Sequence, residues 1–87
     1  INKESLINTF KELWDYSSGT TKYTLTLSTQ SKELIADTYV KLVDVTDEML
    51  AADAYAANKL PCEVCESTDE GAMLITDYAT AKNWTIA

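Results

Sequence analysis

Residues 79–87 read ATAKNWTIA, and residues 22–28, near the other end of the chain, read KYTLTLS. Both stretches contain an aromatic residue, a threonine and an aliphatic residue in succession, at 23–25 and at 84–86. Each triplet follows a segment with helical periodicity and a break. We interpret the two ends as copies of one helix-then-strand unit, which predicts two short parallel strands with helices behind them.

The first unit begins with an amphipathic segment. Its apolar residues follow the i, i+1, i+4, i+7, i+8 spacing of one helix face, at Leu6, Ile7, Phe10, Leu13 and Trp14. Asn2 is a suitable N-cap, so the pattern predicts a helix over residues 3–16. Residues 23–28 then alternate in polarity, which predicts a strand.

The second unit has a similar order. Ser67 and Glu70 stand at capping-box spacing and predict a helix that starts near residue 68. Leu74, Tyr78 and Ala81, accompanied by Ile75 and Ala79, form its expected apolar stripe. Asn83 is suited to the left-handed conformation that ends a helix, and the last residues predict a strand.

The segment between the two units has its own pattern. Residues 31–37 predict a short helical turn capped by Ser31, and the β-branched residues of 38–45 predict an extended segment. Thr46 then predicts the start of an alanine-rich helix that runs up to Pro61. The apolar face of this helix is thin, so we expect it to be partly exposed.

The segment PCEVCE, residues 61–66, reads as a further short strand. The expectation for the whole middle part, residues 34–66, is an inserted β-α-β element in which this strand returns beside the extended segment 38–45. The predicted fold class is therefore α/β, or α+β, with two helix-strand units and one insertion.

The composition of the chain argues against two classes of function, nucleic-acid binding and membrane insertion. The 87 residues predict one small domain with a thin core, and a first residue that is Ile1 suggests a fragment of a longer chain. The net charge is −7 and all seven basic residues are lysines, a composition that argues against nucleic-acid binding. No apolar stretch approaches the roughly 20 residues of a membrane span, so we expect no membrane insertion.

The two ends also resemble a known family. ESLINTFKELWDYSSGTTKYTLTLS together with STDEGAMLITDYATAKNWTIA is similar to the BspA-like leucine-rich-repeat segments of phage tail-associated and bacterial surface proteins of Firmicutes. The resemblance covers roughly 50 positions and leaves residues 34–66 as an insertion. It implies a non-enzymatic structural or protein-binding module, with a protein partner or self-association, in a virion or on a bacterial surface. A cytoplasmic location stays open.

Cys62 and Cys65 are the only cysteines and leave alternatives open. A redox couple needs a stabilised thiolate, whereas the acidic residues nearby should raise the thiol pKa; these are Glu63, Glu66, Asp69 and Glu70. A zinc site needs four ligands, and the chain has no histidine, so metal binding would require carboxylates or a second chain. The remaining interpretation is a pair of structural thiols on a strand.

Other candidate sites are few. The acidic stretches DVTDE and STDEG lack the spacing of a calcium loop, and without histidine the usual nucleophile relay is missing, so we predict no enzyme, catalytic residue or cofactor. Trp14, Tyr78 and Trp84 fall on expected inner faces. Tyr16 and Tyr55 are the aromatic residues most suited to contact a partner.

Overall fold

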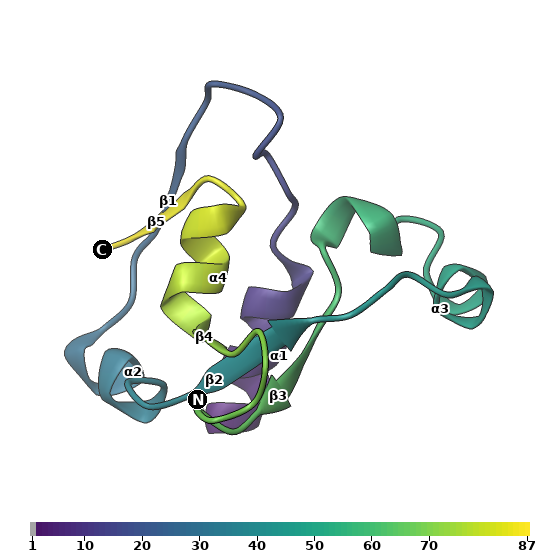
Figure 1. Cartoon of the computed structure of the whole chain (residues 1–87). Helices are drawn as coiled ribbons and strands as arrows, with labels where there is room; N and C mark the ends of the chain where they lie inside the picture. The colour runs from purple at the N-terminus through teal and green to yellow at the C-terminus, as the bar shows by residue number, and fades with distance from the viewer. Residues whose placement is uncertain (1) are drawn as a thin grey trace.

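A computed structural model describes residues 2–87. Its elements are, in chain order, α1 (Lys3–Glu12), β1 (Tyr23–Leu25), α2 (Thr29–Leu34), β2 (Tyr39–Leu42), α3 (Asp47–Ala52), the 3₁₀ helix η1 (Ala56–Lys59), β3 (Cys62–Cys65), β4 (Met73–Leu74), α4 (Ile75–Ala81) and β5 (Trp84–Ile86). Helices and strands mix as predicted, with one small parallel sheet and one small antiparallel sheet (Figure 1).

The parallel sheet confirms the pairing of the two repeat units. β1 lies beside β5, and Tyr23, Thr24 and Leu25 are matched with Trp84, Thr85 and Ile86 in register. Residues that align in the sequence repeat are thus neighbours in space. The ladder is short because β5 has only three residues, and the strand predicted over 23–28 ends at Leu25.

The second sheet has the order β3-β2-β4, and both of its pairs are antiparallel. The segment around Cys62 returns beside β2 as expected, but its direction is opposite to that of a parallel β-α-β crossover. The reason is the connection: α3 and η1 lie on an arm that folds back on itself, so β3 runs against β2. Figure 1 shows α3 at the end of this arm, away from the other elements.

The core lies where α1 and α4 meet the antiparallel sheet. Its large, fully buried apolar side chains are Leu6 and Phe10 of α1, Ile35, Val40 of β2, and Ile75 and Tyr78 of α4. Deep burial of such large side chains contributes roughly 1.5–3 kcal/mol each and is the main driving force for folding here. The helical face predicted from the first five apolar positions supplies two of the six.

Several predicted boundaries are wrong, each for a local reason. α1 ends at Glu12 and not at residue 16, because Leu13 is extended. After it, the amide groups of Asp15 and Tyr16 donate to Asn58 and Lys82 in other elements. α2 begins at Thr29 with Ser28 as its cap, and the amide of Ser31, the expected cap, donates to the Ser28 hydroxyl.

The capping box at Ser67 and Glu70 is not formed. The chain turns there: the amide of Glu66 donates to Asp69, and Gly71 has a φ of 78° that suits glycine. The following residues pair with β2 as β4, which delays α4 until Ile75. Tertiary pairing thus outweighs the local capping signal.

The alanine-rich helix is shorter than predicted and as exposed as predicted. Thr46 caps α3 through Met49, but α3 ends at Ala52 and a separate 3₁₀ turn precedes Leu60. No residue of α3 is buried. Helices of this length are unstable without packing, which explains the early end.

We predict that Asn83 contributes to stability in two separable ways. It adopts the expected left-handed conformation with φ of 66°, and its side-chain amide donates to the carbonyl groups of Tyr16 and Gly19 at 2.8 and 3.2 Å. Asn83→Gly keeps the conformation but loses these bonds, at a cost of about 1–2 kcal/mol. Asn83→Ala should lose roughly 1 kcal/mol more through backbone strain.

Urea unfolding of the three proteins measures both quantities. Equal stability of the glycine and alanine variants would show that the left-handed backbone carries no cost at this position.

Candidate functional site

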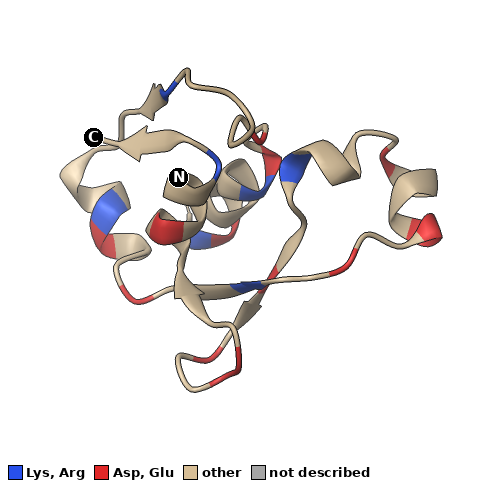
Figure 2. Ribbon diagram, turned by 45° about the horizontal axis from the view of Figure 1, so that its top comes forward, with Lys and Arg blue, Asp and Glu red and all other residues tan. Residues whose placement is uncertain are grey.

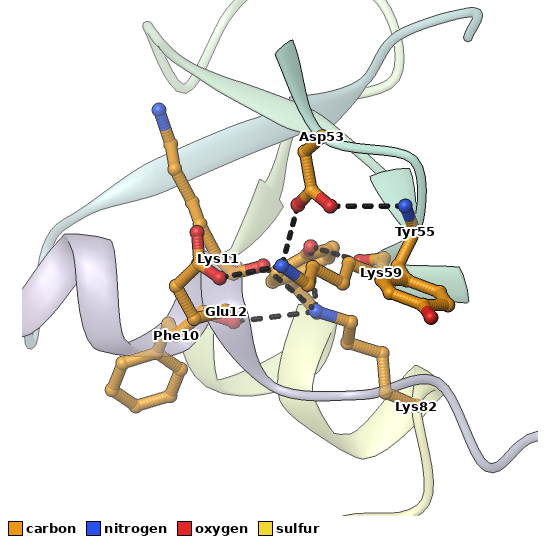
Figure 3. Close-up of polar contacts among 8 residues, drawn as sticks. Phe10, Lys11, Glu12, Asp53, Tyr55, Lys59 and Lys82 are labelled. Atoms are coloured by element: carbon orange, nitrogen blue, oxygen red, sulfur yellow. Dashed lines mark hydrogen bonds and ion pairs between the residues drawn. The ribbon is translucent and has the colours of Figure 1, made fainter. Parts of the chain in front are cut away.

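Titratable side chains converge where α1 ends and meets η1 and α4. This polar node consists of Glu12, Asp53, Lys59, Tyr78 and Lys82 (Figure 3). Lys59 Nζ lies between two carboxylates, 2.7 Å from Glu12 and 2.6 Å from Asp53. The ion pairs raise the pKa of Lys59, and they lower the pKa of Asp53.

Lys82 is the most unusual member of the node, because it is a lysine with no exposed surface. Its ammonium group donates to the carbonyl oxygens of Phe10 at 3.3 Å and Lys11 at 3.5 Å, and to the Tyr78 hydroxyl at 2.8 Å. Each of the three ammonium protons of Lys82 therefore has one acceptor. The two carbonyl groups belong to the last turn of α1, where the helix dipole favours a cation.

Tyr78 connects this cation to the arm. Its hydroxyl donates to the carbonyl oxygens of Lys59 and Leu60, at 2.8 and 2.7 Å. Leu60 has a left-handed φ of 49°, which is rare for a bulky residue, and the hydrogen bond from Tyr78 helps to hold it. Burial raises the pKa of Tyr78, so its hydroxyl stays protonated as a donor.

Burial also shifts the charge equilibrium of Lys82. Desolvation lowers its pKa to about 8, although Cys62, Asp15 and Glu12 act in the opposite direction. An amine of this kind is chemically suited to nucleophilic work. Here, however, the ammonium group of Lys82 donates only to protein atoms and has no exposed surface. It therefore acts as a cap for the last turn of α1.

A depression of about 150 Å³ adjoins the node. It is lined by Lys11, Glu12, Asp53, Ala56, Lys59, Pro61 and Cys62. The two carboxylates are already paired with Lys59, and residues 2–87 contain no group of three or more ligand-type side chains that would hold a metal ion. The depression is thus a small hollow of mixed polar and apolar lining without a convergent catalytic pair.

The cysteines lie on β3, and the strand separates them. Residues three apart on a strand face opposite sides and have Cα atoms about 10 Å apart, beyond the reach of a disulfide. Cys62 is buried and Cys65 is half-buried. Desolvation raises the pKa of both thiols, and the nearby Asp69, Glu63 and Glu66 raise that of Cys65 further, as their spacing in sequence indicates.

The predicted contact residues are placed on two different surfaces. Tyr16 is half-buried and packs with Tyr23 and Trp84, with ring centroids 4.3 and 6.1 Å away, and Tyr23 and Trp84 are 5.4 Å apart. We call these three residues the aromatic surface. Tyr55 is 61% exposed and packs only its inner side against Trp14, at 5.5 Å.

The aromatic surface combines three parts of the chain. Tyr23 starts β1, Trp84 starts β5 beside it, and Tyr16 is brought in by the bond from Asn83. Trp84 Nε1 donates to the Trp14 carbonyl at 2.8 Å, which orients its ring. Tyr23 is 40% exposed, while of the three expected inner aromatics only Tyr78 is fully buried and the two tryptophans are half-buried.

Sequence reasoning identified Tyr16 but missed Lys82 and Tyr23. A signal for Lys82 existed: Ile75, Tyr78 and Lys82 stand at i, i+3 and i+7, the spacing of one helix face. The stripe predicted from the apolar residues alone places Ala81 on this face instead. The structure exposes Ala81 and buries Lys82.

Comparisons with known proteins add no relative. No family model matches the chain, and searches of curated proteins and of solved structures return no match. Within residues 2–87, no helix has the length and apolar character needed to cross a membrane.

The charge of Lys82 should be visible in the pH dependence of stability. Its pKa is about 8 in the folded state and about 10.5 when unfolded, so the unfolded chain binds more protons between these values. Stability linked to Lys82 is therefore gained as the pH rises from 8 to 10.5. Relative to Lys82→Met, the wild type should gain about 2–3 kcal/mol over this interval.

Urea unfolding at several pH values under reducing conditions measures this difference. The raised pKa values of Tyr78 and the thiols act with the opposite sign above about pH 9, but both proteins share these groups. Parallel pH profiles for the two proteins would show that burial does not lower the pKa of Lys82.

The two thiols should react independently of each other, and each should be alkylated slowly. At neutral pH, Cys65 should react with iodoacetamide more slowly than free cysteine, and Cys62 should react only when the protein unfolds. Mild oxidation should leave the monomer mass without the loss of two hydrogens. Rapid formation of an internal disulfide would contradict the strand geometry.

Proposed function

We propose that this chain is a non-enzymatic module that acts by protein association, within a phage-derived or bacterial surface protein. The observation that carries the proposal is the aromatic surface, where Tyr16, Tyr23 and Trp84 pack together with Tyr23 40% exposed. Tyrosine and tryptophan are enriched at the centres of protein interfaces, because they bury a large area at little entropic cost.

The surroundings of the aromatic surface support this role. β1 and β5 pair only with each other among the described residues, so each has a free edge next to the aromatic rings. Free strand edges present unpaired backbone groups that accept further strands. Thr24 and Thr85 alternate with the packed residues and are exposed on the other face of the two strands.

The repeat supports the choice of protein class. The helix-then-strand units are stacked in parallel with equivalent residues in register, an arrangement in keeping with the resemblance to BspA-like leucine-rich repeats. Modules of this kind present surfaces for binding, and among residues 2–87 the Lys82–Tyr78 pair is fully buried while Lys59 is held by its two ion pairs, so neither pair is arranged to act on a substrate. Location in a virion or at a bacterial surface rests on the resemblance alone.

The proposal predicts a partner that is bound through Tyr23 and is left chemically unchanged. A photoreactive phenylalanine analogue at position 23 should cross-link one protein in the cells that produce this protein. Tyr23→Ser should then lower the measured affinity for that purified protein at least tenfold, since truncated aromatic anchors often cost about 2 kcal/mol or more.

Tyr55→Ser is the matched control, since it makes the same change at an exposed tyrosine outside the aromatic surface. It should leave the affinity within about twofold. Loss of affinity only in Tyr55→Ser would move the contact away from the aromatic surface, and a change in the mass of the partner on incubation would contradict the non-enzymatic role.

A further inference from the structure

The outer part of the arm, residues 43–55, which precedes η1, makes few packing contacts with the rest of the molecule. α3 has no buried residue: its Leu50 is 39% exposed, and Val45, which precedes the helix, is 38% exposed. An element that projects without packing loses conformational entropy without a matching gain from burial. Its apolar side chains are therefore available to another surface.

The arm is also strongly acidic. It carries Asp44, Asp47, Glu48 and Asp53 and no basic residue. Asp53 is paired with Lys59, whereas the other three form no ion pair within residues 2–87. Figure 2 shows acidic positions along the arm out to its tip. A surface that receives the arm must offer apolar contact next to positive charge.

The same chain presents such a surface between α1 and β3. A shallow groove of about 440 Å³ is lined by Lys3, Glu4, Ile7, Asn8, Lys11 and Val64. Val64 is 53% exposed at the open edge of the sheet, and Ile7 is half-buried beside it. Lys3 and Lys11 have no ion-pair partner in the described part of the chain, and they outnumber the one glutamate.

We propose that the arm of one molecule docks in the α1–β3 groove of a second copy. Leu50 and Val45 would cover Ile7 and Val64, while Asp47 and Glu48 would approach Lys3 and Lys11. A second copy is favoured over an unrelated partner because one chain offers both complementary surfaces. This inference goes beyond the proposed function, because neither surface includes the aromatic residues Tyr16, Tyr23 or Trp84.

The geometry of the contact determines the kind of assembly. Arm and groove are different surfaces, so the contact is head-to-tail, and each bound molecule still offers one free arm or one free groove. Association is then open-ended. α3 is about 9 Å long, and an interface built on it falls below the usual 800 Å² per partner, so the complex should be weak and salt-dependent.

Sedimentation equilibrium from about 10 μM to 1 mM at low salt tests the proposal. The average mass of the wild type should rise above that of a monomer with concentration, and this rise should shrink at high salt. Leu50→Glu removes a competent arm and Val64→Glu a competent groove, so each variant alone should stay monomeric. Ser18→Glu adds the same charge on an exposed turn and should associate like the wild type.

Mixing the two variants gives the decisive result. Leu50→Glu retains the groove and Val64→Glu retains the arm, so an equimolar mixture should form a 1:1 dimer and nothing larger. Circular dichroism and melting temperature verify that both variants are folded. A wild type that remains monomeric at 1 mM, or a mixture that remains monomeric, would overturn the proposal, and neither result would bear on partner binding through Tyr23.

Discussion

The buried ammonium group of Lys82 is the constraint on which the arrangement of the elements depends. A cation in a dry interior is costly unless every donor is paired, and here the acceptors come from α1 and from Tyr78. Tyr78 in turn donates to the segment that ends η1. One side chain therefore specifies how α4, the C-terminal end of α1 and the base of the arm meet.

The turn after Lys82 extends this constraint to the parallel sheet. The carbonyl group of Lys82 accepts from Tyr16, and Asn83 in its left-handed conformation reaches Tyr16 and Gly19 with its side chain. β5 leaves this turn directly beside β1, so a polar node in the core positions Tyr16, Tyr23 and Trp84 as neighbours at the surface. The buried polar contacts of Lys82 and the exposed aromatic rings are therefore linked through the same turn.

The arm, in contrast to the core, is held mainly by contacts at its base. It is anchored at its base by Lys59, which bridges Glu12 and Asp53, and by the packing of Tyr55 against Trp14, whereas α3 has no buried residue. The cysteines beside that base lie on opposite faces of β3, and both thiols have a raised pKa. The polar groups at this end of the molecule thus form ion pairs at the surface. The thiol of Cys62 serves as a small core side chain.

The sequence by itself determined the elements whose signals are local: the apolar face of α1, the cap at Thr46, the turn at Asn83 and the repeat that pairs residues 23–25 with 84–86. Only the tertiary structure decided where α4 begins, because pairing of β4 with β2 overrides the capping box at Ser67. It also decided that Lys82 is buried, since its three acceptors come largely from groups about 70 positions away, and that the return strand β3 runs antiparallel. Long-range hydrogen bonds carry no local pattern, and for that physical reason the polar node and the aromatic surface emerge only when the chain is folded.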